Sequence, residues 1–221
     1  MGDDGNYLQT ATADHVIGNI QAQWTGGINN KITYKDFSFS FLIDVKKGGS
    51  VFSLDQAYGQ DTGLYPETAG INDLGNPVRN TLADGGGYIN SGVMSNPAYT
   101  PTNGLPQYIT NTTRVDASDS SEASGFGYGI SANPDKAYVY DASYVKLREA
   151  GLTYNFPRKF LSKTFIKGGS FSVLGNNLWI IHKNLPYADP EAGTSSGNVQ
   201  GYQSGVMPTV KVYSFNLKVN F

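Results

Sequence analysis

The chain has no cysteine among its 221 residues, which excludes disulfides, thiol catalysis and cysteine-bound metals. Charged residues are also scarce, at 15% of the sequence, and 16 Lys and Arg against 18 Asp and Glu give a net charge of −2. This balance supports neither a basic nucleic-acid-binding face nor an acidic tail. With 27 Gly and 15 Tyr, the composition favours strands, turns and long polar loops over helices.

Long apolar runs are missing as well. No stretch approaches the roughly 18 apolar residues of a membrane-spanning helix. Residues 1–20 lack the basic and apolar regions of a signal peptide. One kind of membrane protein stays compatible with these absences, because the strands of an outer-membrane barrel show only a weak alternation of apolar and polar residues.

Such an alternation occurs in five segments and predicts five β-strands. The first two strands, separated by Lys35 and Asp36, predict a hairpin with a very short turn. In the third segment, the apolar residues move from odd to even positions after Leu147. This change predicts either a bulge near 149–151 or two unequal halves. The predicted strands lie near residues 23–35, 37–46, 143–156, 170–180 and 210–221.

The connections between these strands are alternately short and long. Those at 35–36 and 157–169 are short, and the second has room for one helical turn, whereas 47–142 and 181–209 are long. Antiparallel strands place successive connections at opposite ends, so all short turns lie on one side and all long loops on the other. This asymmetry is typical of an outer-membrane barrel with periplasmic turns and extracellular loops. A soluble sandwich would show the same alternation over shorter runs and is the alternative.

Aromatic residues fit the same orientation. Trp24 and Trp179 fall at the extracellular ends of their strands, as expected for one aromatic girdle. A second girdle is expected near the periplasmic ends, formed by Tyr34, Phe37, Phe156 and Phe221.

Five groups of residues form a combination that is more specific than any one of them. They are Val16–Asn19 with Trp24, Gly26 and Gly27; Tyr34–Phe39 followed by Lys47–Gly49; Ala142–Arg148; Gly175–Leu178; and Asp189–Glu191. In this order and spacing they resemble the C-terminal portion of the SusC/RagA family of TonB-dependent outer-membrane transporters of the Bacteroidetes. The sequence departs from the family at Trp179–His182, where small hydroxyl residues are commoner, and at Glu149–Ala150, which interrupt an apolar strand.

The resemblance implies a large antiparallel transmembrane β-barrel of roughly 22 strands, closed around a plug, in the bacterial outer membrane. It also implies a SusD-like surface lipoprotein as partner and energy from the TonB complex, acting on the plug. We expect residues 1–221 to be a C-terminal part of such a barrel, an all-β chain of about five strands without plug or signal peptide. A fragment, a truncated reading frame and one piece of a split chain all fit this expectation.

The final strand is the first candidate site. Its apolar residues alternate with polar ones up to the last residue, and this pattern resembles the signal that the outer-membrane assembly machinery recognises. Alternatively, the terminal phenylalanine only anchors the strand in the periplasmic girdle. The residues concerned are Tyr213, Phe215, Leu217, Val219 and Phe221.

The 96-residue connection 47–142 is the second candidate, because connections of this length are usually functional or disordered. Tyrosine rings can stack on sugars or contact peptides, and asparagines can bond hydroxyl groups. Each tyrosine could equally pack the loop itself, and Pro190 alone could explain a turn in the second loop. The candidate contacts for ligand or lipoprotein are Tyr65, Tyr88, Tyr99, Tyr108, Asp189 and Glu191.

No pattern supports catalysis, a metal site or a cofactor. His15 and His182 are isolated imidazoles without metal-ligand spacing or a neighbouring nucleophile motif. Asp116, Asp119 and Glu122 lack the order of an EF-hand loop and favour a solvated acidic turn over a calcium site.

The function predicted from the sequence is therefore a part of an importer that takes up glycans or oligopeptides. The alternative is a soluble, secreted all-β carbohydrate-binding module that uses the tyrosine-rich loop.

Overall fold

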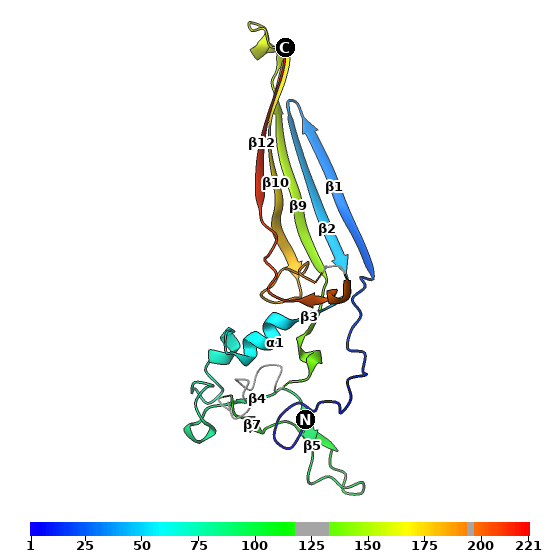
Figure 1. The fold of residues 1–221 in the computed structure, drawn as a ribbon, viewed down its shortest axis with the longest axis vertical. Coiled ribbons are helices and arrows are strands. Elements are labelled where there is room, and N and C mark those ends of the chain that lie inside the picture. Colours follow the sequence, from blue (N-terminus) through cyan, green and yellow to red (C-terminus); the bar gives the residue numbers. More distant parts are fainter. Residues whose placement is uncertain (118–132, 194–196) are drawn as a thin grey trace. The chain divides into compact units, whose positions relative to one another are not determined.

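The computed structural model describes residues 1–117, 133–193 and 197–221 (Figure 1). Its packing divides the chain into two units. Residues 18–51 and 140–221 form the first, here called the sheet unit, and residues 1–17 and 52–139 form the second, the loop unit. None of the helices in these described ranges is long and apolar enough to span a membrane.

The sheet unit is built on five long antiparallel strands, drawn side by side in Figure 1. Their order in the sheet is β1-β2-β9-β10-β12, and the expected all-β class with antiparallel pairing is confirmed. The strands are β1 (Trp24–Tyr34), β2 (Phe37–Lys47), β9 (Tyr144–Asn155), β10 (Gly168–Lys183) and β12 (Val212–Asn220).

The β1–β2 hairpin turns within two residues, since Tyr34 pairs with Phe37. Lys35 has a φ of 53°, in the left-handed region that tight hairpin turns require. The short turn sets the register of the whole pair, from Tyr34 and Phe37 to Trp24 and Lys47. In this register Ile28 faces Ile43 and Ile32 faces Phe39, so apolar residues meet across the middle of the pair.

β10 extends to Lys183, three residues past the end expected from the alternation. Its pairing with β9 shifts register between Asn176 and Trp179 and again between Ile180 and His182. These register shifts interrupt the alternation of apolar and polar residues from which the end of the strand was predicted. The strand itself continues beyond them.

One extra residue in β9 explains its change of parity. Leu42 of β2 pairs with Glu149, but the next residue, Ile43, pairs with Leu147. Arg148 is therefore the bulged residue, one position before the segment where the sequence suggested a bulge. With this extra residue, the apolar side chains of both halves of β9 lie on the same side of the sheet.

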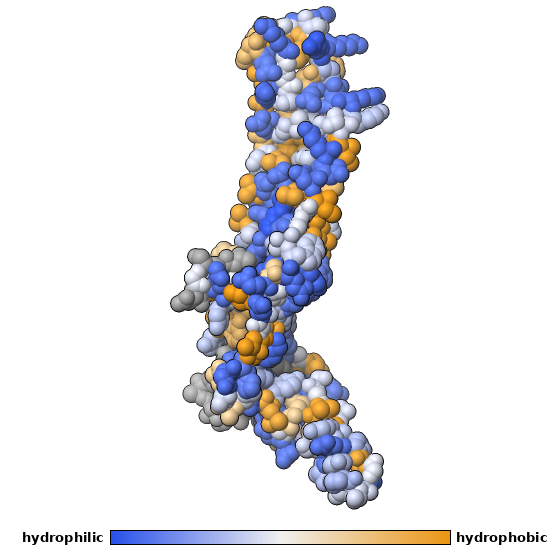
Figure 2. Space-filling model, turned by 90° about the vertical axis from the view of Figure 1, so that its right-hand side faces the viewer, coloured by the Kyte–Doolittle hydropathy of each residue, from blue (hydrophilic) through white to orange (hydrophobic). Residues whose placement is uncertain are grey.

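The register places most large apolar side chains on one side of the sheet, here called the apolar face. Most of these side chains are exposed, such as Ile28 at 60% and Phe215 at 71%, and the others are partly exposed. Orange apolar residues are accordingly visible at the surface in Figure 2. The face comprises Trp24, Ile28, Ile32, Tyr34, Phe37, Phe39, Phe41, Ile43, Val45, Val145, Leu147, Leu152, Tyr154, Phe171, Val173, Trp179, Tyr213, Phe215, Leu217 and Val219.

The opposite side, the polar face, carries mainly hydroxyl, amide and charged groups. Hydroxyls of adjacent strands bond to each other there, at 3.0 Å between Thr33 and Ser38 and at 2.9 Å between Thr153 and Ser172. The sheet therefore has an apolar surface on one side and a polar surface on the other.

A small second sheet lies in the order β11-β3-β8. Val51, Ala142 and Leu185 are buried together near it, with Tyr140 and Ala188 packed against them. Its strands are β3 (Ser50–Ser53), β8 (Val139–Asp141) and β11 (Tyr202–Gln203), and two short helices complete the list, α2 (Arg158–Leu161) and the 3-10 turn η4 (Gly197–Val199).

The loop unit contains short regular elements joined by polar contacts. Side-chain amides bond to backbone carbonyls at several turns, as where Asn72 Nδ2 donates to the carbonyls of Gly85 and Gly87. Arg79 donates to the backbone and hydroxyl oxygens of Thr68. The elements are α1 (Leu54–Asp61), η1 (Pro66–Ala69), η2 (Leu82–Asp84), β4 (Tyr88–Ile89), β5 (Val93–Ser95), β6 (Tyr108–Thr110), β7 (Arg114–Val115) and η3 (Asp135–Tyr138).

Candidate functional site

A group of charged side chains gathers on the polar face of the sheet unit. Alternate residues of β9 point to this face, and they meet a carboxylate from β2 and two more from the connection between β10 and β12. We call this group the ion cluster; it consists of Asp44, Tyr144, Lys146, Arg148, Asp189 and Glu191.

Lys146 is the most enclosed member of the cluster. Its ammonium nitrogen lies 2.5 Å from Asp189 Oδ1 and 2.5 Å from Glu191 Oε2. The side chains of Lys146 and Asp189 are each only 4% exposed. A charge this far from water is tolerated because it is paired and hydrogen-bonded.

Arg148 joins the two ends of the cluster. Its guanidinium donates to Asp44 Oδ2 at 2.7 Å and 3.1 Å, and to Glu191 Oε2 at 2.8 Å. A further bond joins Arg148 to Glu191 Oε1. The Tyr144 hydroxyl lies 3.2 Å from Asp44 Oδ2 and 3.3 Å from Glu191 Oε1. The planar guanidinium of Arg148 can make these contacts at once because it presents several donors in a fixed fork.

The surroundings set the ionisation of both loop carboxylates. Burial would raise the pKa of Asp189, but bonds from Lys146, the Glu191 amide and Thr209 outweigh it and lower the pKa to about 2. Burial likewise opposes ionisation of Glu191, and bonds from Arg148 and Lys146 lower its pKa below the ordinary value. Both groups are therefore anionic at neutral pH.

These contacts indicate that the ion cluster anchors the β10–β12 connection to β9 rather than carrying out a reaction. Thr209 Oγ1 donates to Asp189 Oδ2 at 2.7 Å, so both parts of the β10–β12 connection are tied to β9. Throughout the described ranges, no group of three or more His, Cys, Asp or Glu is arranged to hold a metal ion.

Asp189 and Glu191, expected as ligand or lipoprotein contacts, are thus both engaged within the protein. That expected role stays a prediction. Lys146, Arg148 and Asp44 were not among the expected site residues. The sequence does contain a signal for Lys146 and Arg148. Together with Tyr144 they occupy alternate positions of a strand, between its apolar residues.

The structure places the predicted residues of the final strand together on the apolar face. Tyr213, Phe215 and Leu217 are all more than half exposed. Phe221 follows the end of β12, and its ring stacks on that of Phe165, with centroids 5.5 Å apart and an interplanar angle of 11°.

The four predicted tyrosines fall at three places in the loop unit. Tyr65 precedes η1 with its ring over Gly59, and Tyr88 lies in β4; both are partly buried. Tyr99 and Tyr108 belong to the β5–β6 hairpin and are 36% and 56% exposed. The fold therefore groups only these two on one element.

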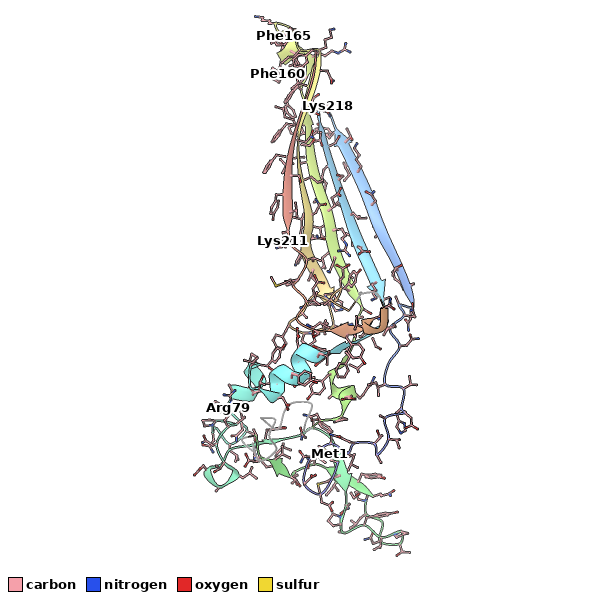
Figure 3. The ribbon with its side chains drawn as sticks, viewed as in Figure 1. Met1, Arg79, Phe160, Phe165, Lys211 and Lys218 are labelled. Carbon is pink, nitrogen blue, oxygen red and sulfur yellow. The ribbon has the colours of Figure 1, made fainter. Side chains whose placement is uncertain are left out.

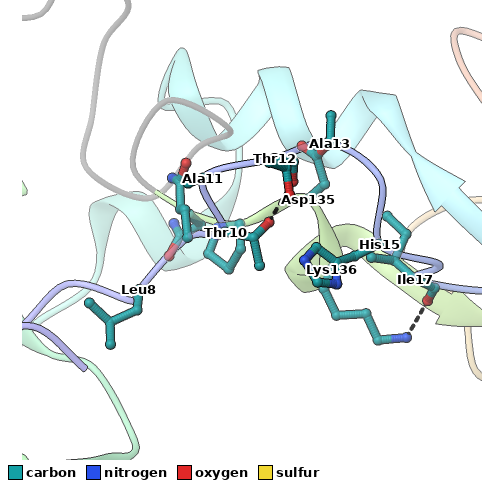
Figure 4. A pocket seen from close by; sticks show the side chains of 12 residues that line it. Leu8, Thr10, Ala11, Thr12, Ala13, His15, Ile17, Asp135 and Lys136 are labelled. Carbon is teal, nitrogen blue, oxygen red and sulfur yellow. Dashed lines mark hydrogen bonds between the residues drawn. The ribbon is translucent and has the colours of Figure 1, made fainter.

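A cavity of about 570 Å³ also lies within the loop unit (Figure 4). The extended segment 8–17 lines one side of it and residues 133–136 line the other. Lys136 Nζ donates to the Ile17 carbonyl at 2.5 Å and joins the two sides. His15 lies on this wall, 3.8 Å from Asp14, whereas Asp119 and Glu122 of the acidic turn lie outside the described residues.

These features define a class of protein. Five paired strands with an exposed apolar face on one side and a polar face carrying bound charges on the other are a section of the wall of a large antiparallel transmembrane β-barrel.

Comparison with known proteins agrees with this class. The chain is similar over 99% of its length to the TonB-dependent receptor P3 of Formosa agariphila, at 28% identity. It is also similar over 93% of its length to the TonB-dependent receptor P26 of the same organism, at 25% identity. It spans 18% of the length of each of these relatives. No family model matches the chain.

Solved structures show the same fold. The RagAB peptide importer in its "open-open" state matches 96% of this chain and 19% of its own, with a TM-score of 0.57 and 17% identity. The "closed-closed" state matches equally well, at 18% identity. The resemblance to SusC/RagA-type TonB-dependent transporters is therefore confirmed, and so is the localisation in the outer membrane.

Proposed function

We propose that this chain forms part of the barrel wall of a TonB-dependent nutrient importer. The single observation that carries the proposal is the apolar face, which spans five hydrogen-bonded strands and exposes its aromatic rings. Such a surface is stable against lipid and costly in water. A soluble carbohydrate-binding sandwich, the alternative, would bury these rings between two sheets.

The proposed cargo is an oligopeptide or a glycan, taken up together with a SusD-like surface lipoprotein. Support for a peptide comes from the structural similarity to RagAB, which is a peptide importer. The exposed tyrosines of the β5–β6 hairpin, Tyr99 and Tyr108, are suited to either cargo, because their rings can stack on sugars and pack on peptide side chains. Tyr65, Tyr88, Asp189 and Glu191 are proposed as weaker contacts.

The chain contributes no catalytic step in this proposal. Energy for uptake would come from the TonB complex acting on a plug elsewhere in the importer. The sheet unit supplies wall and anchored loops, and the final strand, with its alternating residues from Tyr213 to Phe221, supplies the signal for the outer-membrane assembly machinery.

Fractionation and growth assays test the proposal. An epitope-tagged gene should place the protein in the outer-membrane fraction, and affinity purification in mild detergent should co-purify a lipoprotein. Deletion of the gene should abolish growth on the transported peptide or glycan but leave growth on free amino acids and monosaccharides unchanged. A tagged protein found in the soluble fraction, with unchanged growth on every source, would refute the importer.

A further inference from the structure

The connection between β9 and β10, residues 157–167, has an unusual charge for this chain. It contains Arg158, Lys159, Lys163 and Lys167 but no acidic residue, and thus holds four of the 16 cationic side chains. All four are exposed. Within the described ranges none of them forms an ion pair, whereas the other short turn of the sheet balances Lys35 with Asp36. We call residues 157–167 the basic turn.

Two aromatic rings accompany these charges. Phe160 is 69% exposed and Phe165 is 78% exposed. Figure 3 shows both at one end of the sheet, the end at which Figure 1 marks the C-terminus. Because the Phe165 ring stacks on that of Phe221, which continues the apolar alternation of β12, the basic turn extends the apolar face at its edge.

The basic turn is tied to the sheet at both ends. The amide of Phe156 donates to the Gly169 carbonyl at 2.8 Å, and the amide of Lys167 donates to the Asn220 carbonyl at 2.8 Å. Its cations are therefore held next to the rim of the apolar face. Exposed aromatic rings beside unpaired cations, at the rim of a lipid-facing surface, are suited to the boundary between acyl chains and phosphate headgroups.

We infer that the basic turn binds the anionic phospholipids of the periplasmic leaflet, with its cations on the phosphates and with Phe160 and Phe165 at the acyl boundary. This inference rests on the proposed function, because that function puts the apolar face in lipid and the short turns on the periplasmic side. The occupant is assigned by charge: these four exposed cations form no ion pair with the described parts of the chain, and such a group favours a densely anionic surface.

A fluorescent probe can test this inference directly, because the chain has no cysteine of its own. Ser162→Cys, within the basic turn, and Ser204→Cys, in the β11–β12 connection, each give one labelling site on an exposed residue. Each labelled chain, residues 1–221, is mixed from detergent with vesicles of phosphatidylcholine alone, or of an equal mixture of phosphatidylcholine and phosphatidylglycerol. Bound protein and the blue shift of the label are recorded.

Phosphatidylglycerol should increase binding and shift the label at position 162 but not the one at position 204. Lys163→Gln with Lys167→Gln should weaken binding to the anionic vesicles several-fold, and loss of all four cations should weaken it about tenfold or more. Lys163→Arg with Lys167→Arg should retain binding. The matched control, Lys47→Gln with Lys211→Gln, removes two exposed cations elsewhere and should bind like the unaltered chain.

Equal association with both kinds of vesicle, or equal losses in the paired variant and its control, would overturn the inference while leaving the chain membrane-bound. Stronger binding of the basic turn to an acidic protein than to anionic vesicles would also overturn the inference. Failure of the unaltered chain to associate with any vesicle would instead count against the proposed function.

Discussion

Among single residues, Lys146 has the environment that tolerates substitution least. Its ammonium group neutralises two carboxylates, and both it and Asp189 are almost entirely enclosed. We expect Lys146→Met to destabilise the folded sheet unit by about 3–5 kcal/mol, because one partner of a buried ion pair is lost and the other stays. Thermal unfolding in detergent and proteolysis within 184–211 measure the effect.

Two variants serve as controls for Lys146→Met. Lys218→Met replaces an exposed lysine of β12 and should change neither readout. Lys146→Met combined with Asp189→Leu should recover part of the stability, since the buried Asp189 carboxylate is removed together with its partner and Glu191 keeps its bonds to Arg148. Wild-type resistance to protease in Lys146→Met would show that the cluster does not hold the loop.

Asp189 also makes anchoring of the loop depend on pH. Its pKa is about 2 in the folded protein, against about 3.9 when unfolded, so the carboxylate binds fewer protons in the folded state. The stabilisation is fully present above about pH 4 and is lost as the pH falls from about 4 to about 2. Protease sensitivity of 184–211 should rise over this window.

In Asp189→Asn the rise over the same window should shrink, because only the lowered pKa of Glu191 then links this connection to acid pH. An unchanged pH profile in this variant would assign the acid sensitivity to other groups.

At the scale of elements, the junction of β9 and β10 requires glycine at position 169, because a larger side chain would not fit there. A Cβ at Gly169 would lie 2.7 Å from the Phe156 ring and 2.9 Å from the Lys218 carbonyl, whereas a Cβ at Gly168 would meet nothing nearer than 3.4 Å. We expect Gly169→Ala to lower the free energy of unfolding by about 1–3 kcal/mol through overpacking. The adjacent Gly168→Ala should be neutral or slightly stabilising.

Denaturation curves of the two glycine variants, recorded side by side in the same detergent, compare these costs. Equal effects at both positions would mean that the Phe156 ring and the β12 backbone can move aside, and that the junction is not tightly packed.

At the scale of the whole molecule, the two faces of the sheet predict opposite responses to the same charge. Phe215 and Asn216 are neighbours in β12 but belong to the apolar and polar faces, respectively. A lysine facing lipid near the middle of the membrane costs about 2–4 kcal/mol, whereas one facing the interior costs little. Phe215→Lys should therefore reduce the amount of protein in the outer membrane, and Asn216→Lys should not.

Immunoblots of membrane fractions, with and without urea extraction, give this comparison. Equal membrane levels for the two variants, or a greater loss for Asn216→Lys, would contradict the assignment of the faces.

Local physics made much of the sheet predictable. A period of two and the short turn at Lys35–Asp36 are properties of the sequence, and they predict the strands of the β1–β2 hairpin and the alternation of β12. The bulge at Arg148 was only approximately predictable. The shift in the alternation of apolar residues shows that the strand contains one extra residue, but it does not show which residue lacks a partner on the neighbouring strand. The end of β10 escaped prediction for a similar reason, since register shifts interrupt its alternation.

The sequence by itself determined the all-β class, the one-sided apolar strands and the resemblance to TonB-dependent transporters, because these depend on spacing along the chain. Only the tertiary structure decided that Asp189 and Glu191 meet Lys146 and Arg148, and that Phe165 stacks on Phe221. Pairings between residues more than 40 positions apart depend on strand register and loop path, and neither is encoded in the local pattern.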